Sequence, residues 1–224
     1  MLNCWHLWLC EANYRRVEAL EGIPPRPHVL AYQAPANSLT EGGPVVLPER
    51  ARSISCSCEL AVEIDQIAYQ ADDKEAAQAI RGYRVLAGFR DSALYEEVPQ
   101  PTPRDKGVSV YYARWADTFN CVGPLIPCDQ AADPYDAQMR VEIEGYAPVL
   151  TNSNDYLHQA PAAIAALSQF ATLQPGDIIS LGRAGSMVEV PSDQQLAGGT
   201  RVFAEIAGVG QVEAVIEDGR RIRK

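Results

Sequence analysis

The chain has 224 residues, of which 47% are hydrophobic and 21% are charged, a balance typical of a folded globular protein. Asp and Glu number 29 against 19 Lys and Arg, so the net charge is −10, which argues against binding to a phosphate backbone. No apolar stretch reaches the roughly 18 residues of a membrane span, and six dispersed cysteines are too few for a disulfide scaffold. We therefore expect a cytoplasmic protein that binds neither nucleic acid nor membrane.

Short predicted elements alternate with loops in the first half of the chain. Residues 11–22 are consistent with a short helix that ends before the proline-rich loop 23–27. Residues 53–68 alternate apolar and polar side chains, which predicts a half-buried strand. Asp72 followed by Glu75 is a capping-box pattern, which predicts a helix over the alanine-rich residues after it.

The second half of the chain is also rich in strand patterns. Pro161 begins a segment in which Ile164, Leu167 and Phe170 share one helical face, which predicts a helix. Period-two patterns and one turn predict short strands at 108–112, 139–146, 177–181, 201–206 and 211–216. No repeat or linker divides the chain. The sequence thus predicts one β-rich α+β domain with two or three peripheral helices.

Several side chains have a simple structural interpretation. Cys56 and Cys58 lack the spacing of a zinc site and lie on the apolar face of strand 53–68, so we predict that both are buried apolar residues. Glu63 is predicted to face solvent from the other face of this strand. Three histidines are scattered without an evident partner, so we expect surface or structural roles for them: His6, His28 and His158.

Other side chains leave two interpretations open. Cys121 is a packing residue or a reactive thiol, and Arg90 and Asp91 reach a pocket or occupy an exposed turn. The basic residues among 220–224 are predicted to be a solvated tail.

Several segments together resemble one protein family. Residues 168–182 read Ser-Gln-Phe-Ala-Thr-Leu-Gln-Pro-Gly-Asp-Ile-Ile-Ser-Leu-Gly and resemble the LS-x-F-x-T-L-x-P-G-D-x-I-x-T-G-T-P motif of the fumarylacetoacetate hydrolase family. Residues 117–124 resemble its D-x-F-x-P-x-G-P motif, and 59–64 resemble the end of its E-x-E-L-x-V-x-I-G strand. Residues 82–83 and 152–155 fit two shorter motifs of the family, and the motifs keep the family's order over most of the chain.

The resemblance implies a fold and a division of the chain. The family fold is a mixed β-sandwich roll with a few peripheral helices. Residues 1–50 look especially like one subgroup of the family, the short, diverged N-terminal half of the two-part isomerase/decarboxylase of homoprotocatechuate breakdown. We expect residues 1–50 to form an N-terminal strand and lid segment packed on a fumarylacetoacetate hydrolase-like domain of residues 51–224, within one compact unit.

The resemblance also implies a metal site that this chain has largely lost. Family members hold Mg²⁺ or Mn²⁺ with three carboxylates, and the corresponding positions here are Ser57, Glu59 and Gly88. Since only Glu59 is retained, we predict no tightly bound cofactor, and weak binding of Mg²⁺ or Mn²⁺ is left open. One guanidinium, from Arg114 or Arg183, would balance the remaining carboxylate.

Further positions are assigned by the same resemblance. Glu59, Arg114 and Asp117 fall at catalytic positions, although Asp117 is also explained as fixing the backbone and Glu59 as a structural partner of an arginine. Substrate binding is assigned to Gln33, Gly182 and Arg183.

Some members of the family carry a His/Glu lid dyad after an Asn-Tyr pair, which here is Asn13 and Tyr14. Val17 and Leu20 occupy the dyad positions, with Glu18 and Glu21 close by.

The implied function leaves three hypotheses. The first is an enzyme that isomerises or decarboxylates a small acidic carbonyl substrate, a 2-oxo or 2-hydroxy dienoic dicarboxylate. The second is a non-catalytic subunit that pairs with an intact, metal-bearing paralogue, and the third is a metal-free enzyme of a biosynthetic pathway. We expect a homodimer, or a heterodimer with such a paralogue, and whether the chain is itself an enzyme is left open.

Overall fold

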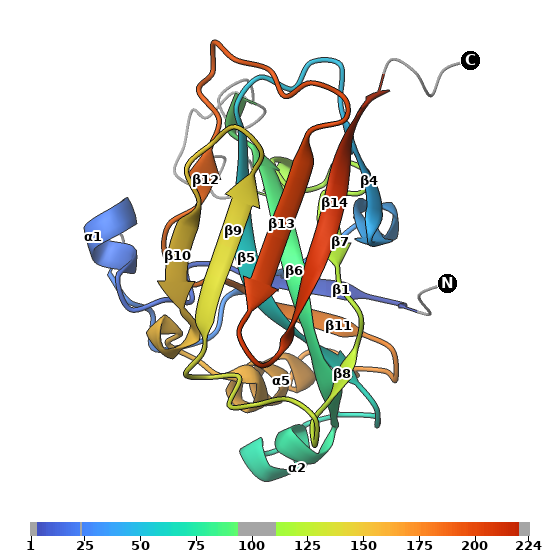
Figure 1. Cartoon of the computed structure of the whole chain (residues 1–224). Coiled ribbons are helices and arrows are strands. Elements are labelled where there is room, and N and C mark those ends of the chain that lie inside the picture. Colours follow the sequence, from blue (N-terminus) through green and yellow to red (C-terminus); the bar gives the residue numbers. More distant parts are fainter. Residues whose placement is uncertain (1–3, 23, 94–110, 220–224) are drawn as a thin grey trace, which may run out of the picture.

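Two β-sheets packed face to face form the body of the protein (Figure 1). The computed structural model describes residues 4–22, 24–93 and 111–219. In that part of the chain the larger sheet has nine strands in the order β2-β1-β11-β5-β6-β7-β3, with β12 paired to β5 and β8 to β6. The smaller sheet has five strands in the order β10-β9-β13-β14-β4.

The strands of the larger sheet are β1 (Leu7–Cys10), β2 (Ala31–Ala34), β3 (Leu39–Glu41), β5 (Ile54–Ile64), β6 (Ile80–Asp91), β7 (Asn120–Val122), β8 (Ile126–Pro127), β11 (Ile178–Arg183) and β12 (Val188–Glu189). Those of the smaller sheet are β4 (Gly43–Leu47), β9 (Gln138–Ile143), β10 (Val149–Asn152), β13 (Arg201–Ile206) and β14 (Gly210–Asp218). The helices are α1 (Val17–Glu21), α2 (Asp73–Gln78) and α5 (Ala160–Ser168), with 3₁₀ turns at Ala36–Ser38 and Ser153–Asp155.

The main hydrophobic core lies between the two sheets. Leu60 and Phe89 enter it from the larger sheet, and Met139, Val141 and Ala204 enter it from the smaller one, all at 2% exposure or less. α2 and α5 lie together at one end of the molecule, and α1 stands apart at its side (Figure 1). The predicted mixed β-sandwich with a few peripheral helices is therefore confirmed.

β5 differs from its prediction because both of its faces are buried. The face with Cys56 and Cys58 packs into the main core, as predicted. The opposite face was predicted to meet solvent, but Glu63 is only 5% exposed and accepts hydrogen bonds from Arg81 and Arg84 at 2.8 Å each. A central strand of a sheet that is covered on both sides has no face exposed to solvent. The alternation of apolar and polar residues in β5 therefore distinguishes the face that enters the core from the face that carries polar side chains.

The helices are shorter than the segments that the sequence predicted to be helical. α2 carries the predicted capping box of Asp72 and Glu75. α5 ends at Ser168, so Phe170 lies beyond it and is 91% exposed instead of belonging to the apolar face. Only α1 is helical within 11–22, because the backbone turns sharply at Ala12, whose φ is +54°.

The first fifty residues contribute strands to both sheets. β1, β2 and β3 belong to the larger sheet, while β4 pairs in parallel with β14 of the smaller one. Of the strand predicted at 108–112, residues 108–110 lie outside the described residues, and 111–112 are helical. The tail 220–224 also lies outside them. No helix within the described ranges has the length and apolarity to cross a membrane.

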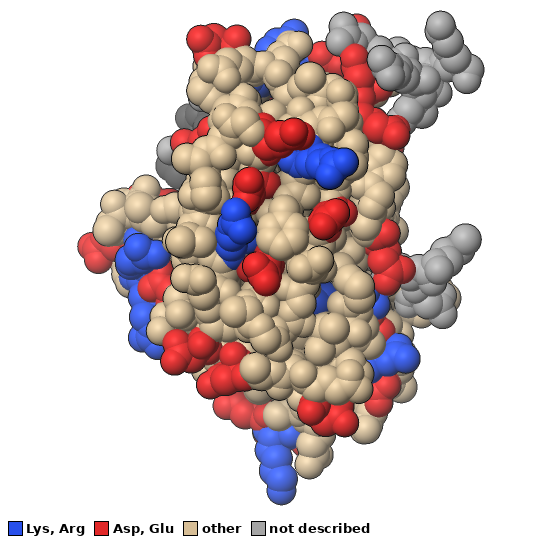
Figure 2. All heavy atoms as spheres, viewed as in Figure 1, with Lys and Arg blue, Asp and Glu red and all other residues tan. Residues whose placement is uncertain are grey.

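Acidic side chains outnumber basic ones on the molecular face shown in Figure 2, and the two signs are interspersed. The described atoms of this face show no continuous basic patch.

Candidate active site

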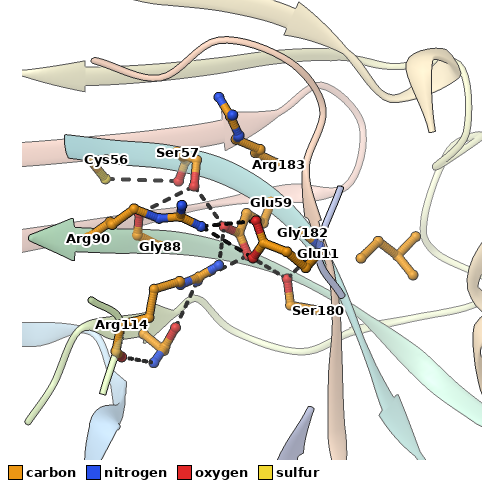
Figure 3. Close-up of polar contacts among 12 residues, drawn as sticks. Glu11, Cys56, Ser57, Glu59, Gly88, Arg90, Arg114, Ser180, Gly182 and Arg183 are labelled. Carbon is orange, nitrogen blue, oxygen red and sulfur yellow. Dashed lines mark hydrogen bonds and ion pairs between the residues drawn. The ribbon is translucent and has the colours of Figure 1, made fainter. Parts of the chain in front are cut away.

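The face of the larger sheet that points away from the main core gathers polar side chains. Strand pairing places Ser57 opposite Gly88, and Gly88 opposite Asn120, across β5, β6 and β7. Since alternate residues of a strand share one face, Glu59 projects from the same side as Ser57. Ser180 of β11 reaches Glu59 from the neighbouring strand (Figure 3).

Glu59 is fully buried and forms a two-pronged ion pair with Arg114. Arg114 donates from Nη1 to Oε1 at 2.8 Å and from Nη2 to Oε2 at 3.2 Å. Ser57 Oγ donates to Oε1 at 2.7 Å, and Ser180 Oγ donates to Oε2 at 2.5 Å. Each carboxylate oxygen therefore accepts two hydrogen bonds, which offset the cost of burying its charge.

The guanidinium of Arg114 is held on its far side as well. Its Nη2 also donates to Asn120 Oδ1 at 2.8 Å, and Asn120 Nδ2 donates to Ser38 Oγ at 3.0 Å. Burial alone would lower the pKa of Arg114, but the adjoining Glu59 carboxylate outweighs it, and the pKa is raised above its usual value. Arg114 is thus a permanent positive charge at this position.

Gly88 leaves the space that the ion pair fills. A Cβ atom built on Gly88 would lie 2.5 Å from Arg114 Nη2 and 2.5 Å from Glu59 Oε1. Its backbone is ordinary extended strand, so the constraint on a side chain here is space and not conformation.

A pocket opens beside this pair, and two further ion pairs border it, of which Figure 3 shows that of Arg90 with Glu11. Arg90 Nη2 lies 3.2 Å from each carboxylate oxygen of Glu11. Arg183 pairs with Glu21 of α1 and donates from Nη1 to the Gly185 carbonyl at 2.9 Å. The pocket lining is Cys10, Glu11, Ala12, Ser57, Glu59, Gly88, Arg90, Arg114, Arg183 and Met187.

The structure brings together some of the predicted site residues and not others. Glu59 and Arg114 form the predicted pair, whereas Arg183 lines the pocket but pairs with Glu21 instead of Glu59. Gln33 is exposed on β2, and Asp117 is exposed and hydrogen-bonded by Asn37. Neither belongs to the described pocket lining.

Gly182 has a backbone role beside the site. Its φ is +77°, a conformation that favours glycine, and a Cβ there would lie 2.4 Å from the Cys10 carbonyl oxygen. The Gly182 carbonyl accepts a 2.8 Å hydrogen bond from Tyr156.

Sequence reasoning missed Glu11, Ser180 and Asn120. A polar residue inside the apolar strand pattern 177–181 was the available signal for Ser180. Arg90, for which two interpretations were open, lines the pocket with a side chain 19% exposed.

The residues at positions 57, 59 and 88 do not fit a hard divalent cation. Mg²⁺ or Mn²⁺ asks for about six oxygen ligands, preferably with several carboxylates. Glu59 is the single carboxylate among the three positions, and both its oxygens are engaged by a guanidinium and two hydroxyl groups. Within the described residues, no three His, Cys, Asp or Glu side chains are grouped so as to hold a metal ion.

Cys10 and Cys121 are buried thiols, and two of the histidines have polar partners. Burial raises the pKa of the Cys10 thiol to about 12, so it is protonated at neutral pH, and burial does the same for Cys121. His6 and His158 have partners that the sequence did not indicate, since His6 Nδ1 lies 3.0 Å from Asp177 Oδ1 and His158 Nε2 lies 3.1 Å from the Arg26 carbonyl oxygen.

Comparison with known proteins gives one family. The model described as "Fumarylacetoacetate (FAA) hydrolase C-terminal" matches residues 5–217. An uncharacterised protein of Pyrococcus horikoshii is 27% identical over 190 residues, which cover 85% of this chain and 78% of that protein. A mitochondrial oxaloacetate tautomerase of Arabidopsis thaliana is 24% identical over 212 residues, which cover 94% of this chain and 89% of that enzyme.

The match covers less than half of a third relative. The 4-hydroxyphenylacetate degradation bifunctional isomerase/decarboxylase of Salmonella dublin is 29% identical over 192 residues, which cover 84% of this chain and 41% of that enzyme.

Solved structures share the fold. Fumarylpyruvate hydrolase from Pseudomonas aeruginosa, crystallised with Mn²⁺ and pyruvate, superposes with a TM-score of 0.79 at 18% identity, covering 96% of this chain and 90% of that one. The 2-hydroxyhepta-2,4-diene-1,7-dioate isomerase from Mycobacterium marinum superposes with a TM-score of 0.76 at 21% identity, covering 97% of this chain and 76% of that one. The sandwich described above is therefore a fold that these enzymes also have.

Proposed function

The chain belongs to the fumarylacetoacetate hydrolase family, and from that premise we propose that it binds a 2-oxo or 2-hydroxy dienoic dicarboxylate and isomerises or decarboxylates it without a divalent metal ion. The relatives whose names state an activity support the reaction class, since they are an isomerase/decarboxylase and an oxaloacetate tautomerase. Tautomerisation of a 2-oxo acid passes through an enol or enolate, and so does decarboxylation when the carboxylate that leaves is attached to the carbon next to the carbonyl or to a conjugated position.

The observation that carries the proposal is the set of guanidinium groups around the pocket. Arg90, Arg114 and Arg183 all line it, and Arg114 holds the buried Glu59 in a two-pronged pair. A guanidinium presents a planar pair of donors that matches a carboxylate or an enolate oxygen next to a carbonyl. Fixed positive charges in a poorly solvated site stabilise the negative charge that develops on an enolate oxygen.

Like Arg114, whose Nε atom also lacks a hydrogen-bond partner, Arg183 is placed to contact a ligand. Its Nε atom is buried without a hydrogen-bond partner, while its Nη atoms are held by Glu21 and by the Gly185 carbonyl. A buried donor without a partner is costly unless a ligand or water completes it. We assign to Arg183 the binding of a substrate carboxylate, and to the Glu59–Arg114 pair the electrostatic role that a metal would otherwise fill.

Ligand binding under metal-free conditions tests the proposal. The purified protein, dialysed against EDTA, should bind 2-oxoglutarate in calorimetry with an affinity that added Mg²⁺ or Mn²⁺ does not raise. Arg183→Ala should weaken binding by about 1.5–3 kcal/mol, the range for a charge-assisted hydrogen bond. Lys74→Ala, which removes an exposed charge on α2, is the matched control and should leave the affinity unchanged.

Stoichiometric Mn²⁺ or Mg²⁺ in the purified protein, or binding that appears only when metal is added, would return the chain to the metal-dependent members of its family.

The match to only 41% of the Salmonella enzyme favours one alternative, a subunit that acts with a metal-bearing homologue. In that case the chain alone would bind the dicarboxylate without converting it, and conversion would appear on mixing with the homologue.

A further inference from the structure

Two carboxylates, Glu11 and Glu59, line the pocket, and only one of them has lone pairs free to accept a proton. Glu59 is fully buried, and four hydrogen bonds occupy its two oxygens. A carboxylate with four hydrogen bonds can balance the charge of Arg114, but it offers no free lone pair to a substrate proton. The enolisation that the proposed function requires therefore needs another group.

Glu11 is the second carboxylate. It follows the last residue of β1, lines the pocket, and its side chain is 15% exposed. The contact described for it is with a single nitrogen, Arg90 Nη2, which lies 3.2 Å from both oxygens (Figure 3). A donor shared at that distance leaves lone pairs on both oxygens open to the pocket.

The backbone around Glu11 is held in an uncommon conformation. Ala12, which also lines the pocket, has a φ of +54°, a region that residues other than glycine seldom adopt. Asn13 clamps the turn by donating to the Leu181 carbonyl at 3.2 Å and by accepting from the His158 amide at 2.9 Å. Such outliers cluster at functional sites, where the surrounding structure holds a side chain in one direction.

We propose that Glu11 is the catalytic acid–base residue of this pocket and that Arg90 is its positioning residue, a proposal that rests on the function inferred above. The ionised Glu11 carboxylate takes a proton from the carbon next to the substrate carbonyl. The C–H electron pair becomes the C=C bond of the enolate, and the carbonyl π pair moves to oxygen, where a guanidinium stabilises it. The proton on Glu11 returns to carbon at the same or a conjugated position, which leaves the carboxylate ionised again.

Proton exchange measures this step without knowledge of the natural substrate. In D₂O the protein should replace the C3 protons of 2-oxoglutarate by deuterium, which ¹H NMR follows as loss of the C3 signal. Glu11→Gln keeps the shape of the side chain but cannot accept the proton, so exchange at saturating 2-oxoglutarate should fall by about 100-fold or more. Its dissociation constant should be unchanged or lower, because a negative charge near a dianion is removed.

Two further variants separate chemistry from packing. Glu11→Asp keeps a carboxylate and should retain part of the exchange that Glu11→Gln loses. Arg90→Gln removes the positioning contact and should lower the exchange rate by about 10-fold, less than the loss of the base itself. Glu213→Gln, at an exposed position on β14, is the matched control and should exchange like the unmodified protein.

The outcomes distinguish this inference from the function on which it rests. Binding with exchange that is unchanged in Glu11→Gln would assign the proton transfer to another group and overturn the role of Glu11. Binding without exchange in the unmodified protein would overturn it also. Absence of binding would overturn the proposed function itself. Equal losses of affinity and exchange in Glu11→Gln would show that Glu11 only shapes the pocket.

Discussion

At the scale of single residues, Gly88 and Arg114 form one spatial unit with Glu59. The guanidinium fits because position 88 has no side chain, since a Cβ there would lie 2.5 Å from Arg114 Nη2. The buried pair is tolerated because the hydroxyl groups of Ser57 and Ser180 complete the carboxylate. Loss of one partner would leave the other as an uncompensated buried charge.

A double-mutant cycle tests this coupling. Gly88→Ala should lower the free energy of unfolding by about 1–3 kcal/mol through overpacking, and Arg114→Met should lower it by about 3–5 kcal/mol because Glu59 loses its partner. The double variant should lose less than the sum, since removal of the guanidinium frees the space that the methyl group needs. Urea unfolding provides the measurement.

Gly198→Ala is the control for this cycle, because a Cβ there meets nothing nearer than 3.9 Å. It should change the free energy of unfolding by less than about 0.5 kcal/mol. Strict additivity of the two site variants would contradict the spatial coupling.

At the scale of elements, β5 carries the site and α2 covers one end of the sandwich. β5 spans the core on one face and the polar site on the other, so its register decides what Glu59 contacts. α2 has only six residues, and a helix of that length depends on its cap and on packing against α5.

Removal of the α2 cap should be measurable. Asp72 accepts hydrogen bonds from the amides of Lys74 and Glu75, at 2.9 and 2.8 Å. Asp72→Ala should lower the free energy of unfolding by about 1 kcal/mol. Asp73→Ala, in the exposed first turn, should lower it by less than about 0.5 kcal/mol. Equal effects of the two changes in urea unfolding would refute the capping role.

At the scale of the whole molecule, large apolar side chains remain at the surface of the single chain. Ile67, Tyr69 and Phe170 are 60% exposed or more, and their segments lie side by side because the Gln70 amide donates to the Ser168 carbonyl. Monomeric proteins rarely leave such groups together without a use.

We predict that the protein is at least a dimer in solution, either with itself or with a homologue. Light scattering after size exclusion should give about twice the chain mass of 24.4 kDa at micromolar concentration. Phe170→Ser tests whether this apolar surface takes part, with Leu150→Ser on β10 as an exposed apolar control. A single species of one chain mass, with or without a homologue, would contradict the prediction.

The sequence by itself determined most elements and the family motifs, because alternation, capping and motif order are local properties. Only the tertiary structure decided which arginine balances Glu59. Arg183 lies directly across the strand pair from Glu59 and lines the same pocket, but it forms its ion pair with Glu21 of α1.

Arg114, 55 residues from Glu59 in sequence, fills the space beside Gly88 instead. The burial of Glu63 and the pairing of Glu11 with Arg90 were likewise decided by which segments cover the second face of the sheet. Contacts between segments far apart in sequence depend on strand register and on the space that neighbouring side chains leave. A local sequence pattern predicts neither of these.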